Sequence, residues 1–456
     1  MKKYKVIFIV LFFIILIVPI CFINIKKDQI SKIDNSKLPE ISEIDDVETL
    51  DNYVSKRIGF RSQIINLYTV LNDKLFHKMI HPSYDYGDNG YVFRKINLEL
   101  DESEYLDTYA SLVKNMQEYV ISRGTYFLYV LDPNKKTIEI DKLPIGYHYN
   151  DTKVKYLINK FDELEINYIY NANALKDKSK EIPTFNKKYD AGHWNDYGAF
   201  YGIKNIFDKL NEDNVIDENI SLDEYKIRYV NKESLPTSKF KINEDVPLFT
   251  LNRKYYKVKS IKKEILLSKD YNDAFKTINN TKNTNILLFR GSYIIGNDKF
   301  ISNKFNEVYY IHNYQNAINY DYYYNLANKP EIVIFEGVDY AMDNLYFNEE
   351  DMKKKKTNVT YDSLQNLEVN YGNILTVKDL GKLNLKISNT KHYFDLEFTN
   401  KKIKYAYLII SNNVYDVSKI DKKFKITLPI ELASGENIKL VLIDKKITKK
   451  YFIYIN

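Results

Sequence analysis

Asn285-Ile-Leu-Leu-Phe-Arg-Gly-Ser-Tyr293 joins a short apolar run to a glycine and a serine. Such a run is typical of a strand that is buried on both faces, as in a parallel sheet covered by helices. Residues 126–131, before Asp132-Pro133, and residues 331–336 form two further runs of this kind. Helical periodicity occupies about 103–120, 152–164 and 198–210. This alternation predicts an α/β domain with a largely parallel sheet flanked by helices.

The first 26 residues predict a membrane anchor. Met-Lys-Lys-Tyr-Lys precedes an uncharged run over residues 6–25, which is long enough to cross a bilayer as a helix. No cleavage site of small residues follows this run, and Cys21 lacks the preceding small residue of a lipoprotein signal. The leading lysines predict that residues 1–5 lie in the cytoplasm and that the chain after about residue 26 lies outside the cell membrane. A cleaved signal peptide is the alternative that these residues leave open.

The composition predicts an exported globular chain of more than one domain. Of its 456 residues, 45% are hydrophobic, and 42 tyrosines and 24 phenylalanines supply ample core material. The single cysteine lies in the predicted anchor, so the outer part has no disulfide and no cysteine-based metal site. We expect no metal and no other cofactor. The net charge of +6 is small and the lysine runs lie among acidic residues, which argues against nucleic-acid binding.

Composition and periodicity divide the chain into four parts. Residues 1–26 form the anchor, and residues 27–45 are polar enough to be a stalk. Residues 46–374 form the α/β domain, in which 214–281 lose the strand–helix rhythm and are expected to be an insertion. Within its first part, 46–77 show a helical period that Gly59 interrupts. In residues 375–456 apolar side chains alternate at period two, which predicts an antiparallel β-sandwich that binds glycan or acts as a spacer.

A carboxylate, an imidazole and a hydroxyl occur in two motifs of the α/β domain. Asp190-Ala-Gly-His193-Trp194-Asn195 carries the first two, and Arg290-Gly-Ser292-Tyr293 carries the third. Asp190 precedes His193 by three residues, so its carboxylate can orient the imidazole and stabilise the imidazolium that forms when a serine loses its proton. Ser292 follows a predicted strand, at the sheet edge where ligands gather. Together these are the groups of a serine acyl-transfer site.

Neighbouring residues are candidates to complete this site. Gly291 lets the backbone approach a substrate, and Arg290, Lys135 and the N–H of Ser292 are candidates to stabilise an oxyanion. Trp194, the only tryptophan, would exclude water. Asn195 and Tyr293 are further candidates for substrate binding. A structural interpretation of each motif stays open: a strand-to-loop turn at Ser292, a capping histidine at 193 and a loop at Lys135.

With these motifs the chain resembles the DHHW and alginate O-acetyltransferase (AlgJ/AlgX-like) family of SGNH-type acyltransferases. The resemblance spans roughly residues 45–340 in the family's order. The motifs that carry the resemblance are Gly59-Phe-Arg61, Gly90-Tyr-Val-Phe93, Pro133-Asn-Lys135, the Asp190–His193 motif and the Ser292 turn. It implies an SGNH-like fold and the transfer of acyl groups, usually acetyl, to hydroxyls of extracellular polysaccharides. It also implies a membrane-bound O-acyltransferase as a partner that often supplies the acyl group.

Departures from the family's pattern bear on activity. Two residues separate Asp190 from His193 instead of one, which is the spacing of SGNH esterases in general. Gly291 replaces an aspartate that braces the nucleophile turn, and Asp339 stands near the expected place of a late arginine. The sequence therefore predicts an extracytoplasmic O-acyltransferase that acts on polysaccharide through an acyl-serine at Ser292. An SGNH-type carbohydrate esterase and an inactive glycan-binding or assembly protein are the alternatives.

Overall fold

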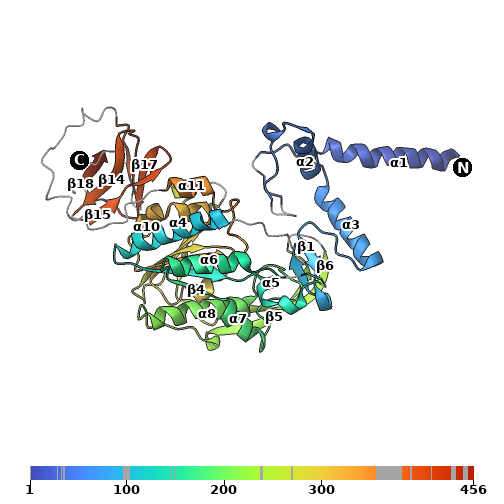
Figure 1. Ribbon diagram of the computed structural model, residues 1–456, viewed down its shortest axis with the longest axis horizontal. Helices are drawn as coiled ribbons and strands as arrows, with labels where there is room; N and C mark the ends of the chain where they lie inside the picture. The colour runs from blue at the N-terminus through green and yellow to red at the C-terminus, as the bar shows by residue number, and fades with distance from the viewer. Residues whose placement is uncertain are drawn as a thin grey trace.

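An apolar helix, an α/β domain and a C-terminal β-domain follow one another in the structure (Figure 1). The computed structural model describes residues 2–27, 29–31, 33, 36–95, 103–144, 146–147, 149–236, 240–268, 271–355, 383–390, 393–411, 413–432, 438–444 and 450–455. The expected boundary between residues 374 and 375 lies outside the described residues.

A seven-stranded sheet forms the centre of the α/β domain, in the order β4-β3-β11-β9-β10-β8-β7. Its parallel strands are β4 (Tyr168–Tyr170), β3 (Tyr126–Asp132), β11 (Ile332–Val338), β9 (Asn285–Arg290) and β10 (Glu307–His312). The antiparallel edge consists of β8 (Ala274–Ile278), paired with β10, and β7 (Lys257–Ser260), paired with β8. Side chains of β9 and β11 are buried almost throughout, as their unbroken apolar runs predicted. The expected largely parallel sheet is confirmed.

Helices cover both faces of this sheet (Figure 1). On one face α4 (Ser103–Ile121) contacts α6 (Thr152–Glu163), α10 (Tyr320–Leu326) and α11 (Glu349–Lys354). On the other face α7 (Ala172–Ser179) packs against α8 (Asp196–Glu212). The long helices α4, α6 and α8 coincide with the three helical periods of the sequence. The short helices α5 (Lys135–Ile138) and α9 (Gln315–Ile318) follow the carboxyl ends of β3 and β10.

Segment 214–281 contains two kinds of structure. The strands β5 (Tyr225–Ser234) and β6 (Lys241–Leu251) pair as a hairpin outside the main sheet. By contrast, β7 and β8 in the later part of this segment join the main sheet at its edge. Their residues and those of β10 mix polar and apolar types, so the sequence did not indicate these strands. These strands form because they pair with strands from distant parts of the sequence.

The N-terminal region contains α1 (Lys2–Cys21), α2 (Val47–Arg57), α3 (Arg61–Phe76) and the small hairpin of β1 (Tyr84–Tyr86) and β2 (Val92–Arg94). The part of α1 from Tyr4 to Cys21 is long and apolar enough to cross a membrane. Gly59 separates α2 from α3, as expected. The buried guanidinium of Arg57 donates hydrogen bonds to the carbonyls of Asn24, Lys26 and Pro39. These bonds hold the last residues of the expected anchor and Pro39 of the expected stalk against the end of α2.

The C-terminal domain consists of two four-stranded antiparallel sheets, in the orders β12-β13-β17-β16 and β15-β14-β18-β19. The strands are β12 (Lys386–Asn389), β13 (Phe394–Phe398), β14 (Ile403–Ile410), β15 (Asn413–Asp416), β16 (Ser418–Ile420), β17 (Lys423–Leu428), β18 (Ile438–Asp444) and β19 (Lys450–Ile455). Alternating apolar residues of β13 and β17 in one sheet and of β14 and β18 in the other share one core, which confirms the predicted β-sandwich.

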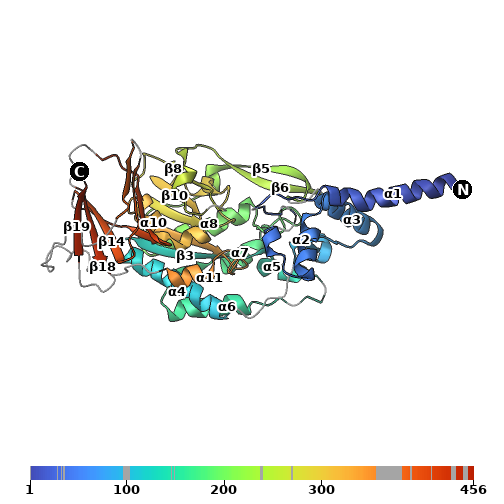
Figure 2. The same cartoon turned by 90° about the horizontal axis from the view of Figure 1, so that it is seen from above.

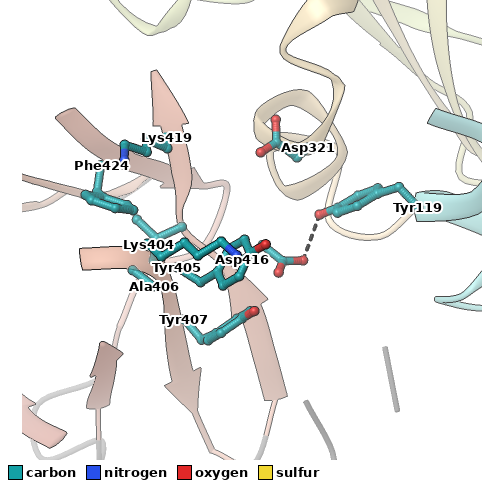
Figure 3. Close-up of a pocket in the computed structure, with 10 residues that line it drawn as sticks. Tyr119, Asp321, Lys404, Tyr405, Ala406, Tyr407, Asp416, Lys419 and Phe424 are labelled. Atoms are coloured by element: carbon teal, nitrogen blue, oxygen red, sulfur yellow. Dashed lines mark hydrogen bonds between the residues drawn. The ribbon is translucent and has the colours of Figure 1, made fainter. Parts of the chain in front are cut away.

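The sandwich packs against α10 of the α/β domain, and Tyr119 of α4 bonds to it. Tyr119 on α4 donates a hydrogen bond of 2.8 Å to the carboxylate of Asp416 (Figure 3). Arg123 forms a 2.7 Å ion pair with the same carboxylate. A cavity of about 30 Å³, lined also by Asp321 and Lys404, lies at this junction. It has room for little more than a water molecule, so the junction is a packed interface.

Candidate active site

The hydroxyl of Ser292 lies just beyond the carboxyl end of β9, in the middle of the sheet. Its Oγ is 3.4 Å from the hydroxyl of Tyr340, which follows the neighbouring strand β11. Both strands are parallel, so both turns emerge at the same sheet edge. Ser292 therefore occupies the position that the sequence predicted for a nucleophile.

Asp190 and His193 form the local pair that their spacing suggested. The distance between His193 Nδ1 and Asp190 Oδ1 is 2.6 Å, and Asp190 reaches this position with a left-handed φ of 48°. Partial burial works against the charge of the carboxylate, but the imidazole charge and its hydrogen bonds outweigh it and lower the pKa of Asp190. The carboxylate thus orients the ring and leaves Nε2 as the nitrogen for proton transfer.

Two hydrogen bonds join the Asp190–His193 segment to the serine turn. The indole Nε1 of Trp194 donates to the carbonyl of Tyr293 at 2.9 Å, and the hydroxyl of Tyr293 donates to the carbonyl of Gly192 at 2.6 Å. The rings of Trp194 and Tyr293 also meet edge to face, with their centroids 4.9 Å apart. These contacts bring residues 190–194 and 291–293 together although they are distant in the sequence.

Ser292 and His193 line two cavities. The first, about 400 Å³, is also lined by Arg94, Tyr314 and Tyr346. The second, about 470 Å³, extends over Asp190, Trp194 and Tyr293 to the β5–β6 hairpin. Each has the volume of a typical small-molecule site, which is about 300–1,000 Å³. In the described part of the chain no hydrogen bond joins Ser292 to His193. Catalytic contacts of this kind often tighten only when substrate binds.

Arg94 is a residue of the site that the sequence analysis missed. It ends β2, directly after Gly90-Tyr-Val-Phe93, and its guanidinium lies 4.9 Å from the ring centre of Tyr340. Burial opposes its charge, but the nearby phenols Tyr340, Tyr346 and Tyr293 raise the pKa of Arg94 above its ordinary value, so it stays cationic. A cation in the wall of the cavity that holds Ser292 suits a developing oxyanion. Only its place after the Gly90–Phe93 motif could have indicated it.

The carboxyl group of Glu336 on β11 lies against the backbone of the serine turn. It accepts the backbone N–H of Gly291, and burial raises the pKa of Glu336 to about 8 although the N–H groups of Gly291, Tyr293 and Ile294 favour its charge. A Cβ at position 291 would lie 2.9 Å from Glu336 Oε1. The glycine therefore makes room for a carboxylate that comes from another strand.

Three of the site residues that the sequence predicted do not line the cavities; they form structural contacts. Arg290 is buried and pairs with Asp273 at 2.5 Å. Lys135 donates to the carbonyls of Val92 and Lys187 at 2.8 and 2.9 Å, and burial lowers its pKa to about 7. Gly291 donates its N–H to Glu336. None of the three is among the described residues that line either cavity.

Asn195 lines the second cavity but also caps a helix. Its side chain accepts the N–H of Gly198 at 3.0 Å at the start of α8 and donates to the carbonyl of Pro183 at 2.9 Å. Asn195 therefore fixes the loop that carries His193. Within the described ranges no group of three or more His, Cys, Asp or Glu side chains is placed to hold a metal ion.

No protein-family model matches the chain, and no curated protein sequence matches it. Solved structures are similar at low identity. PatB1 of Bacillus cereus is 18% identical with a TM-score of 0.46, covering 59% of this chain and 98% of that one. The O-acetyltransferase domain of Pseudomonas putida AlgJ is 10% identical with a TM-score of 0.43, covering 62% and 100%. Pseudomonas aeruginosa AlgX is 12% identical with a TM-score of 0.38, covering 81% and 89%. Likeness of this extent does not tell what the site does.

Proposed function

We propose that the protein is a membrane-anchored, extracytoplasmic O-acyltransferase that modifies hydroxyls of a cell-surface or secreted polysaccharide. The observation that carries this proposal is that Ser292 and His193 line the same two cavities while Asp190 holds the other nitrogen of the imidazole. These are the parts of a serine nucleophile with its general base.

The proposed reaction has two halves. Ser292 Oγ attacks the acyl carbonyl of a donor, His193 Nε2 accepts the hydroxyl proton, and the same proton leaves with the departing group. A sugar hydroxyl then attacks the acyl-serine, gives its proton to His193, and the proton returns to Ser292. Arg94 and the backbone N–H of Ser292 stabilise the oxyanion of each tetrahedral intermediate. Transfer prevails over hydrolysis because Trp194 and the cavity tyrosines limit the access of water.

The anchor sets where the reaction takes place. In the proposal α1 stays in the membrane with residues 1–5 in the cytoplasm, and the α/β domain faces the exterior. A membrane-bound O-acyltransferase supplies the acyl group, and the polysaccharide is the acceptor. The β-sandwich either binds the polysaccharide or acts as a spacer.

A fluorophosphonate probe applied to the full chain in detergent tests the nucleophile. We expect labelling of Ser292, which Ser292→Ala abolishes and the exposed control Ser388→Ala leaves unchanged. Replacing His193 with alanine removes the general base, so labelling slows by about 10²–10⁴-fold. If the folded wild-type protein is not labelled, the acyltransferase proposal is wrong, and the alternative of a glycan-binding protein without catalysis is supported.

To separate transfer from hydrolysis, we supply p-nitrophenyl acetate as donor and fully N-acetylated chito-oligosaccharides, which offer only hydroxyls, as acceptor. We expect acetylated oligosaccharide in the mass spectrum with wild type and none with Ser292→Ala. Release of free acetate with unmodified oligosaccharide would identify an esterase instead.

A further inference from the structure

The outer face of α3 is apolar and exposed. Ile64, Leu67, Tyr68, Leu71 and Leu75 recur at the spacing of one helical face, and together with the flanking Phe60 and Phe76 they are 45–70% exposed. A helix of a globular domain normally turns such a face toward the core. A continuous exposed apolar stripe of this kind marks a surface that binds something.

The opposite face of α3 is already occupied. Thr69 is fully buried, and its hydroxyl contacts the carbonyls of Ile65 and Ile80. Asp73 accepts a 2.6 Å hydrogen bond from the hydroxyl of Tyr86. The helix therefore cannot bury its apolar stripe by rotating about its axis without breaking these contacts.

The stripe begins where α1 ends. The N–H of Gly59 donates to the carbonyl of Pro19 at 2.9 Å, and a Cβ at Gly59 would lie only 2.5 Å from the Cβ of Phe22. The rings of Phe22 and Phe60 meet edge to face at 5.3 Å. In both views α3 runs from the end of α1 back toward the side on which α1 projects from the body (Figures 1 and 2). The apolar surface of α1 thus continues onto α3.

Basic residues border the same region. Lys26 and Lys27 follow α1, and Lys74 and Lys78 lie at the end of α3. Cations at the edge of an apolar helical face are typical of helices that lie in the headgroup layer of anionic membranes. The long lysine side chains can keep their ammonium groups among the phosphates while the apolar face enters the acyl region.

We propose that α3 lies in the membrane interface and binds the lipid bilayer through its apolar stripe. The inference rests on the proposed anchoring by α1, since continuity with α1 is its ground, and it does not depend on the acyltransfer chemistry. With α1 crossing the bilayer and α3 lying on it, the protein has two membrane contacts, which the Gly59–Pro19 and Phe22–Phe60 contacts join. These contacts fix the orientation of the α/β domain, and hence of the Ser292 cavities, relative to the membrane surface.

Spin labels on the full chain in nanodiscs of equal parts phosphatidylcholine and phosphatidylglycerol test the proposal. In a Cys21→Ser background, single cysteines replace Leu71 or Leu75 on the stripe, Ile14 in α1 as the lipid reference, and Lys401 in the sandwich as the water reference. Because these side chains are exposed, labelling disturbs no buried contact. Thermal unfolding of each labelled variant checks that it is folded.

The readout is relaxation by oxygen, which concentrates in lipid, against relaxation by a water-soluble nickel chelate. We expect the oxygen-to-nickel ratio at Leu71 and Leu75 to be several-fold higher than at Lys401 and to approach that at Ile14. A ratio like that at Lys401 would overturn the proposal, and so would shielding from both reagents, which would indicate a protein partner or a second copy. Loss of α1 from the purified protein, seen in its mass, would overturn it too. Labelling of Ser292 by fluorophosphonate is independent of each of these outcomes.

Discussion

At position 291 the chain carries a glycine, and the carboxyl group that lies against the serine turn belongs to Glu336. The N–H of Gly291 donates to that carboxylate, and the Cβ of any larger residue would press on Glu336 Oε1 and on Asn313 Nδ2, 2.9 and 3.1 Å away. A side chain from β11 therefore provides the carboxyl group that the resemblance led us to expect at position 291. We interpret Glu336 as a positioning residue that acts on Ser292 through the backbone.

Introducing an aspartate at position 291 tests this interpretation. Gly291→Asp places a second carboxylate and extra volume against Glu336, and overpacking of this kind lowers the free energy of unfolding by about 1–3 kcal/mol. The double variant Gly291→Asp with Glu336→Ala has one carboxylate again, so we expect it to regain stability and the rate of fluorophosphonate labelling at Ser292. Chemical denaturation and labelling kinetics measure both. A double variant that labels no faster than Gly291→Asp alone would contradict the interpretation.

The buried carboxyl of Glu336 also makes stability depend on pH. Its pKa rises from 4.5 to about 8 on folding, so between these values the folded state binds more protons and stability falls as pH rises. Glu336→Gln removes this contribution, so its stability should fall less steeply than that of wild type. Denaturation between pH 5 and pH 7 measures the slopes.

Three other groups titrate in or near this pH range. Burial raises the pKa of Asp339 to about 6, which makes stability fall as pH rises, whereas burial lowers the pKa of His312 to about 4, which makes stability rise with pH between about 4 and 6.5. Wild type and Glu336→Gln share both contributions, so the difference between their slopes reports on Glu336. The pKa of Lys135, lowered to about 7, makes stability rise with pH above that value and would mask the effect there. Equal slopes below pH 7 would show that Glu336 is charged in the folded protein.

At the scale of elements, the short strand β2 contributes more to the site than its length suggests. Val92 donates its N–H to the carbonyl of Lys187 at 2.9 Å, and Arg94 donates its N–H to the carbonyl of Ala191 at 3.2 Å. The strand therefore lies along the segment that leads to His193. This pairing places the Arg94 guanidinium in the wall of the Ser292 cavity.

We expect Arg94→Ala to lower kcat/KM for p-nitrophenyl acetate by about 10²–10³-fold, the usual effect of removing one oxyanion donor. Arg94→Lys keeps the charge and should recover part of the loss. The neighbouring Lys95 is exposed and pairs with Asp85, so Lys95→Ala is the matched control and should leave kcat/KM unchanged. If Arg94→Ala behaves like this control, the guanidinium does not stabilise the oxyanion.

At the scale of the whole molecule, one buried ion pair ties the β-sandwich to the α/β domain. Arg123 and Asp416 are 4% and 13% exposed, and Tyr119 bonds to the same carboxylate (Figure 3). Burial raises the pKa of Asp416 even though Arg123 lowers it. Removing one partner would leave an unpaired buried charge.

Arg123→Met should therefore lower the free energy of unfolding by about 3–5 kcal/mol and expose the junction to proteases. Lys423 and Glu397 form an exposed pair within the sandwich, so Lys423→Ala should change stability by less than about 1 kcal/mol. Denaturation and limited proteolysis compare the two variants. Equal resistance in both would mean that the sandwich does not depend on Arg123 for its docking.

The helical period over 46–77 shows which features a local sequence pattern can predict. It located α2 and α3 and the break at Gly59, because the spacing of apolar residues and a glycine act within a few residues of the chain. It did not tell which way the apolar stripe of α3 faces. That depends on Thr69 and Asp73, whose partners come from residues 80–86.

The sequence by itself determined the buried strands, the long helices, the alternating β-sandwich and the closeness of Asp190 to His193. Each of these follows from periodicity or from a separation of a few residues. Only the tertiary structure decided that Arg94 instead of Lys135 or Arg290 lines the cavity, that the carboxyl group of Glu336 lies against Gly291, and that α3 turns its apolar face outward. These outcomes depend on contacts between distant segments, and such contacts are set by how the strands pair and how side chains fill the space between them.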